Sequence, residues 1–156
     1  MRNVLTLILA VVAAAATAMG ADDTLGTWKY NTTKSKGAPG VSPIANLTIT
    51  REASDGGVKI TAKGERTDGT KLDSVTNAKY DGKPVTVTGE GLPWDTVVIK
   101  QVNSKTITEE RTKQGGKYHV TARSVVSADG KTMTTTAKGT GADGKPLSTK
   151  AVFDKQ

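Results

Sequence analysis

The chain has 156 residues, a formal net charge of +7 and no cysteine. This length is enough for one domain, and the lack of cysteine excludes disulfide staples, cysteine-ligated zinc and thiol catalysis. A basic chain is compatible with nucleic acid, anionic polymers or lipid surfaces as partners. The lysines are scattered beside turns, however, and no run of five or six basic residues occurs. We therefore expect a solubilising basic surface and no nucleic-acid partner.

The first twenty residues are typical of a secretory signal peptide. Arg2 gives a basic start, Val4 to Val12 is almost entirely aliphatic, and an alanine-rich stretch with small-x-small spacing follows. The apolar run is shorter than the roughly 20 residues that a membrane-spanning helix needs. We predict a signal peptide at 1–20, a single domain at 21–156, and a monomer that is periplasmic or secreted.

The rest of the chain has the pattern of short strands joined by tight turns. Thr, Val and Ile alternate with polar residues, which predicts half-buried strands. Four of the five Asp-Gly pairs are taken to mark turns, because tight hairpin turns favour positive φ and glycine adopts it without strain. These pairs begin at Asp68, Asp81, Asp129 and Asp143. About ten strands are expected, at 25–31, 44–52, 57–66, 70–80, 84–89, 95–101, 105–113, 117–127, 131–139 and 146–153.

The predicted fold is all-β, an antiparallel up-and-down meander that closes into a barrel. Short turns connect every strand after residue 44, and such connections favour antiparallel neighbours. An open sheet of this length would leave two unpaired edges, which closure removes. A two-sheet sandwich is the competing architecture, but it usually needs longer crossings. Stable membrane insertion is not expected, because two Trp, three Tyr and one Phe cannot form two aromatic girdles.

Strand alternation also bears on the charged residues of 105–113. Glu109 and Glu110 are adjacent and point to opposite faces, so they cannot form a catalytic pair. Arg111 shares the face of Glu109 and Ile107. These two charges have two interpretations: a solvated ion pair worth under roughly 1 kcal/mol, or an interior pair that grips the polar head of a ligand.

The opening strand "LGTWKYN" resembles the first strand of the lipocalin and fatty-acid-binding protein superfamily, the calycins, which carries Gly-x-Trp. The closing "AVFDKQ" is similar to the last strand of fatty-acid-binding proteins. The resemblance implies a barrel in which Trp28 plugs one end and Gly26 permits close approach of the chain. The basic residue that packs on this Trp in lipocalins would be Lys150.

The chain also departs from these families. The segment "NTTKSKGAPGVSP" stands where fatty-acid-binding proteins have a helical lid, and it cannot form two helices. The paired Arg and Tyr that hold a fatty-acid carboxylate near the end of those proteins are missing. The resemblance therefore extends to the fold more than to the ligand.

Other candidate site residues occur singly and are not part of a recognisable motif. Trp94 follows Pro93 at a loop–strand junction, and either caps the end opposite Trp28 or lies exposed at a barrel mouth. His119 is the only histidine and is expected on the surface. No nucleophile elbow, phosphate-binding loop or metal motif occurs. We expect no enzymatic activity, no cofactor and no metal.

Two functions remain open. The leading hypothesis is an exported lipocalin-like protein that binds a small, partly apolar or amphipathic ligand in a cavity of a few hundred cubic ångströms. Its expected contacts are Trp28, Trp94, Arg111 and Tyr118. The alternative is a structural or interaction module of the cell envelope with a filled barrel. Such a module would bind an anionic polymer or a partner protein through a basic face that contains Lys34, Lys36, Lys83 and Lys145.

Overall fold

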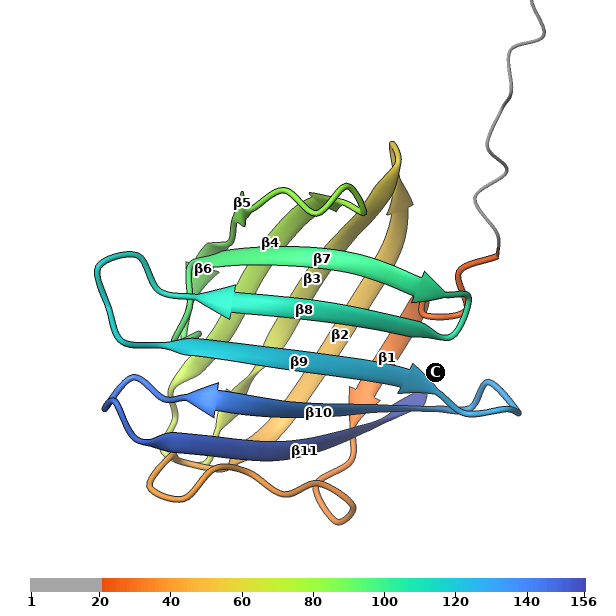
Figure 1. Ribbon diagram of the computed structural model, residues 1–156. Coiled ribbons are helices and arrows are strands. Elements are labelled where there is room, and N and C mark those ends of the chain that lie inside the picture. Colours follow the sequence, from red (N-terminus) through yellow and green to blue (C-terminus); the bar gives the residue numbers. More distant parts are fainter. Residues whose placement is uncertain (1–20) are drawn as a thin grey trace, which may run out of the picture.

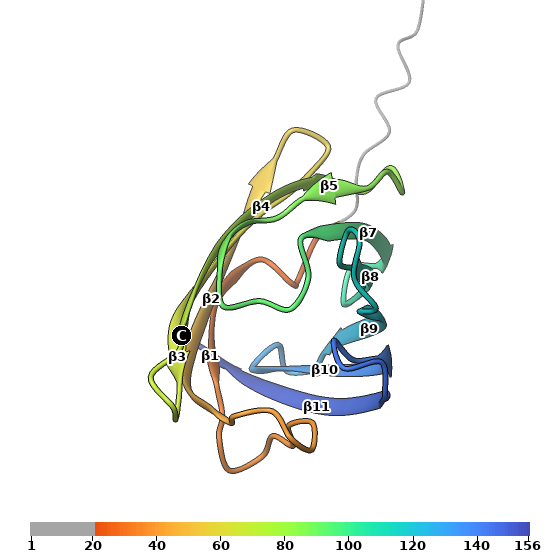
Figure 2. The ribbon, with the colours of Figure 1, turned by 90° about the vertical axis from the view of Figure 1, so that its left-hand side faces the viewer.

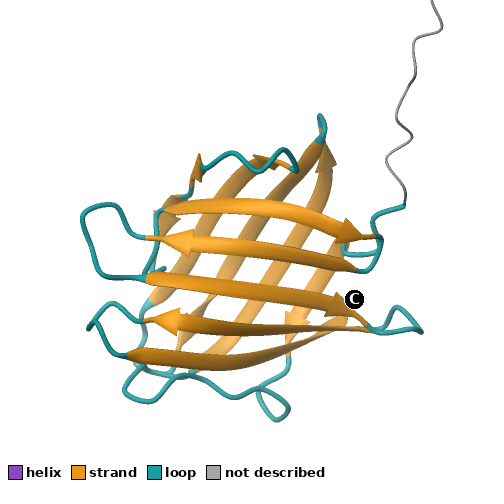
Figure 3. Ribbon diagram, in the orientation of Figure 1, coloured by secondary structure: helices purple, strands orange, loops and turns teal. Residues whose placement is uncertain are grey.

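The computed structural model describes residues 21–156, so the predicted signal peptide lies outside the described residues. The described chain is built from strands, turns and loops (Figure 3). The strands are β1 (Gly26–Tyr30), β2 (Ile44–Ser54), β3 (Gly57–Arg66), β4 (Lys71–Lys79), β5 (Val85–Thr86), β6 (Thr88–Glu90), β7 (Thr96–Asn103), β8 (Thr106–Thr112), β9 (His119–Val126), β10 (Thr132–Thr140) and β11 (Pro146–Lys155). The all-β prediction is confirmed.

All strands belong to one antiparallel sheet, in the order β5-β7-β8-β9-β10-β11-β1-β2-β3-β4-β6. Chain neighbours are sheet neighbours from β1 to β4 and from β7 to β11, and the last strand pairs with the first. Figures 1 and 2 show two facing walls, one of β7 to β11 and one of β1 to β4. The predicted meander is confirmed as a nearly closed barrel.

The barrel is weakest where β5 and β6 lie. The sequence predicted one strand at 84–89, but the chain changes partners after Thr86: β5 pairs with β7, and β6 pairs with β4. Gly89 explains the close approach of β6, because its φ is +131° and a Cβ atom there would lie 2.0 Å from the Asp73 carbonyl oxygen. On this side of the barrel the backbone pairing between the two walls passes through this short segment.

The core consists largely of small side chains, and strand alternation places them. On β9 the inward positions are buried and the outward ones exposed, as the pattern predicts. One pair of polar residues in the core satisfies itself: the hydroxyls of Ser124 and Thr135, both buried, lie 2.7 Å apart. Pairing of this kind removes the cost of burying a hydroxyl without a hydrogen bond.

Trp28 is fully buried, and its Nε1 donates to the Thr24 carbonyl oxygen at 2.8 Å. The Nζ of Lys155 lies 5.0 Å from the Trp28 ring. Gly26, at φ +120°, leaves room for this lysine, since a Cβ atom there would be 3.1 Å from its Cε. The expected basic partner, Lys150, is wrong: the residues of β11 alternate, and Lys150 is on the exposed outer face.

Candidate functional site

Three charged side chains meet inside the barrel, and we call them the interior charge cluster: Arg51 from β2, and Glu109 and Arg111 from β8. Arg111 Nη2 and Nε lie 2.6 and 2.8 Å from Glu109 Oε2. Arg51 Nη1 lies 3.7 Å from Glu109 Oε1. Strands β2 and β8 belong to opposite walls (Figure 2), so this contact crosses the interior. The interpretation of Glu109 and Arg111 as a solvated pair is therefore wrong.

The cluster carries more positive than negative charge, because two guanidinium groups share one carboxylate. Arg51 is 4% exposed, and its Nε and Nη2 are buried without a hydrogen-bond partner among residues 21–156. Buried polar atoms in proteins nearly always have a partner, and an unpaired buried charge is costly. The cluster thus has two donors and one positive charge that an anion would satisfy.

Glu109 remains the negative centre of the cluster. Burial raises the pKa of its carboxyl, but the charges of Arg111 and Arg51 and the hydrogen bond from Arg111 lower it by more, so that the pKa falls below its ordinary value. The carboxylate is ionised at neutral pH. It therefore holds the two arginines in place and does not act as a proton donor there.

Two aromatic rings extend the cluster toward one end of the barrel. The Arg111 guanidinium lies 4.6 Å from the centre of the Trp94 ring, a cation–π contact. Trp94 stacks on Tyr118, with ring centres 5.7 Å apart and planes at 27°. Trp94 comes from the loop between β6 and β7, and Tyr118 immediately precedes β9. Burial raises the pKa of Tyr118, which keeps its hydroxyl neutral.

The structure thus brings together three of the four expected contact residues. The fourth, Trp28, packs with Val126, Met133 and Phe153. Val126 ends β9 whereas Tyr118 precedes its start, so the two tryptophans lie toward opposite ends of that strand. Trp94 thus lies toward the end of the barrel opposite Trp28, and its side chain is partly buried.

Sequence reasoning missed Arg51. A usable signal existed, because Arg51 follows Leu47 and Ile49 at a spacing of two and so continues the inward face of β2. An arginine at the end of an apolar face is, however, more often exposed than buried. The other polar candidate behaved as expected: His119 is exposed, and its Nε2 lies 2.8 Å from Glu110 Oε1.

The segment before β1 reaches the same interior. The Tyr80 hydroxyl donates to Asp22 Oδ2 at 2.6 Å, and the backbone nitrogen of Thr24 donates to Asp22 Oδ1 at 3.0 Å. Burial, together with the hydrogen bond to Asp22, raises the pKa of Tyr80 to about 12, while the charge of Arg51 acts in the opposite direction. Tyr80 is therefore neutral and ties the start of the domain to the end of β4.

Two depressions stand out in the described chain, and both lie outside the cluster. One, of about 460 Å³, is lined by residues of β4 and β6. The other, of about 310 Å³, is lined by the end of β1, the start of the β1–β2 connection and residues near the C-terminus. The predicted interior cavity of a few hundred cubic ångströms is not one of these two.

Two further properties concern residues 21–156 only. This part of the chain contains no helix that is long and apolar enough to cross a membrane. It also brings together no group of three or more histidine, aspartate or glutamate side chains that is placed to hold a metal ion.

Comparison with known proteins identifies the fold. No family model matches the sequence, and no curated protein is significantly similar to it. A crystal structure of zebrafish ileal bile acid-binding protein complexed with cholic acid matches with a TM-score of 0.50 and 10% sequence identity. The match covers 86% of this chain and 100% of that chain. The chain therefore has the same barrel fold as that bile acid-binding protein.

Proposed function

We propose that this protein is an exported, non-enzymatic binding protein whose interior charge cluster holds the anionic head of a small amphipathic ligand. The observation that carries the proposal is Arg51, whose Nε and Nη2 are buried and have no partner in the described chain. A carboxylate, sulfate or phosphate would supply two acceptor oxygens to this fork in one bidentate contact. It would also neutralise the excess charge of the cluster.

The surroundings of the cluster suit an apolar ligand body. Trp94 and Tyr118 lie beside Arg111, and buried Val120 and Ala122 continue the apolar surface along β9. The fold is compatible with this class of ligand, since the similar zebrafish structure contains cholic acid, which is itself an acid. The proposed ligand is therefore partly apolar, as expected from the sequence, and in addition carries a negative charge.

Entry is expected through the segment that joins β4 and β7. Strand β5 pairs with β7 through two residue pairs, and β6 pairs with β4 through three, whereas β10 and β11 share nine. Fewer backbone hydrogen bonds make local opening less costly. Trp94 lies in the loop that follows β6, so displacement of this segment would also uncover Arg111.

The test compares two probes that differ only in the head group, dodecanoate and dodecanol. We expect dodecanoate to change tryptophan fluorescence saturably and dodecanol to bind far more weakly. Arg51→Met should weaken dodecanoate binding at least tenfold, because a charged hydrogen bond contributes about 1.5–3 kcal/mol. Arg123→Met, an exposed arginine on β9, is the matched control. Equal affinities for the two probes, or unchanged binding by Arg51→Met, would refute the proposal.

A further inference from the structure

The lysines nominated from the sequence do not gather on one face. Lys34 and Lys36 lie in the β1–β2 loop, Lys83 in the β4–β5 connection, and Lys145 in the β10–β11 turn. The first two of these connections lie on opposite sides of the barrel in Figure 1. A set of basic residues that shares only Lys36 with these four does gather, along the outer face of the wall formed by β7 to β11.

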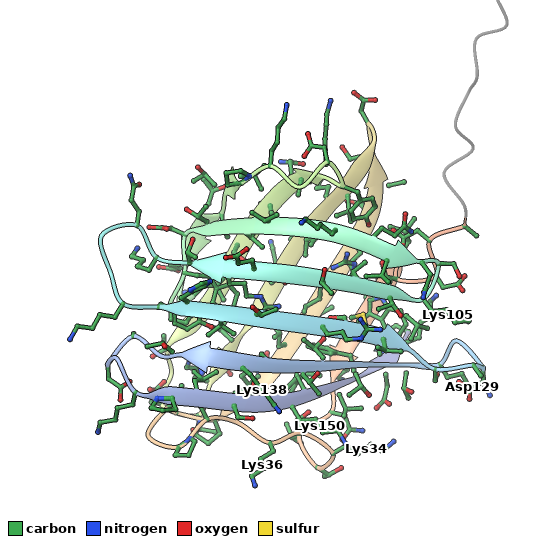
Figure 4. The ribbon with its side chains drawn as sticks, viewed as in Figure 1. Lys34, Lys36, Lys105, Asp129, Lys138 and Lys150 are labelled. Atoms are coloured by element: carbon green, nitrogen blue, oxygen red, sulfur yellow. The ribbon has the colours of Figure 1, made fainter. Side chains whose placement is uncertain are left out.

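Four exposed basic residues lie in one line across this wall, and we call them the basic rank: Lys36, Lys150, Arg123 and Lys100. The strand registers pair Lys36 with Lys150, Lys150 with Thr136, Thr136 with Arg123, Arg123 with Thr108, and Thr108 with Lys100. Neighbouring strands are about 4.8 Å apart, so basic residues separated by a threonine-bearing strand are about 10 Å apart. Figure 4 shows Lys36 and Lys150 on this side, with Lys138 nearby.

The opposite wall has a different charge arrangement. On β2 to β4 three of the outward lysines have a carboxylate directly across the strand pair, and the fourth, Lys79, forms an ion pair with Asp55 in the β2–β3 turn. Lys59 is opposite Glu52, Lys63 is opposite Asp73, and Lys71 is opposite Glu65. That wall is therefore locally neutral, as expected for a surface that only needs to be soluble.

The basic rank has no such compensation. Lys150, Arg123 and Lys100 face threonines across the strands, and Lys36 faces Lys150. None of the four forms an ion pair within residues 21–156. Two carboxylates on the same wall have other partners: Glu110 contacts His119, and Asp154 contacts Asn31 and Lys34. The excess positive charge of the chain is thus concentrated on one wall.

We propose that the basic rank binds an extended anionic polysaccharide that runs across the strands. Its charges would meet the basic residues, and its hydroxyl groups would meet Thr136 and Thr108 between them. Nucleic acid fits less well, because binding of single strands relies on aromatic stacking and all six aromatic residues lie elsewhere. A lipid surface also fits less well, because the large exposed apolar side chains of this wall are two isolated valines, Val102 and Val125.

The experiment measures binding of the purified protein to alginate, a linear polysaccharide with one carboxylate per sugar, with neutral dextran as the control polymer. Two double variants remove the same charge: Arg123→Gln with Lys150→Gln in the basic rank, and Lys59→Gln with Lys63→Gln on the opposite wall. We expect alginate binding that weakens steeply between about 50 and 300 mM salt. The rank variant should bind about tenfold more weakly, and the opposite-wall variant within about twofold of the parent.

Several results would overturn the proposal. They are no binding of alginate, equal loss in both double variants, binding that does not respond to salt, or tighter binding to anionic phospholipid vesicles than to alginate. Circular dichroism checks that each variant is folded. The site is separate from the interior charge cluster, so Arg51→Met should keep alginate binding and the rank variant should keep dodecanoate binding.

Discussion

The interior charge cluster predicts an asymmetry between two substitutions that each remove one charge. Glu109→Gln leaves the guanidinium groups of Arg51 and Arg111 together in the interior without a carboxylate. Removing one partner of a buried ionic group costs about 3–5 kcal/mol, which is a large part of a typical total stability of 5–15 kcal/mol. Arg51→Met instead removes the excess charge and leaves the two short contacts between Glu109 and Arg111 intact. Its unfolding free energy should stay within about 1 kcal/mol of the parent, or rise.

Urea unfolding followed by tryptophan fluorescence and far-ultraviolet circular dichroism measures both values, provided that the slope of free energy against urea is unchanged. The double variant Glu109→Gln with Arg51→Met should recover part of the loss, because its interior holds one unpaired guanidinium instead of two. A coupling of about 0.5–3 kcal/mol is expected for groups in contact. The reasoning is refuted if Arg51→Met costs as much as Glu109→Gln, since Arg51 would then be as well satisfied as the carboxylate.

Three further predictions concern pH and backbone strain. The pKa of Glu109 is lower in the folded state than its ordinary 4.5. Its carboxylate therefore adds to the free energy of unfolding above pH 4.5, and this stabilisation is lost as the pH falls through the lowered pKa. Glu109→Gln should flatten the acid limb of a curve of stability against pH. The pKa of Tyr80 is raised to about 12, so the protein should lose stability as the pH rises from 10 to about 12. Tyr80→Phe should remove this loss. At pH 7 the same substitution should cost about 1 kcal/mol, because it removes the hydrogen bond to Asp22. Gly26→Ala should destabilise by about 1–3 kcal/mol in thermal unfolding, because φ is +120° and the new Cβ atom approaches Lys155; an unchanged melting temperature would contradict it.

Local patterns determined most of the fold. The alternation of apolar and polar residues placed the strands, and Asp-Gly turns with short connections implied antiparallel neighbours. Both patterns span only a few consecutive residues, so they can be recognised in a single sequence. The same alternation correctly placed Glu109 and Arg111 on one face of β8. The exception, the division of 84–89 into β5 and β6, depends on which strand each half finds as a partner.

Tertiary structure alone decided which faces meet. Arg51 joins Glu109 because β2 and β8 lie on opposite walls, and alternation along one strand carries no information about a strand across the barrel. Lys155 contacts Trp28, where Lys150 had been expected, because the pairing of β1 with β11 sets which end of the strand reaches the ring. The basic rank has the same origin. Its members come from four separate segments, and only the summed registers of the sheet place them in line.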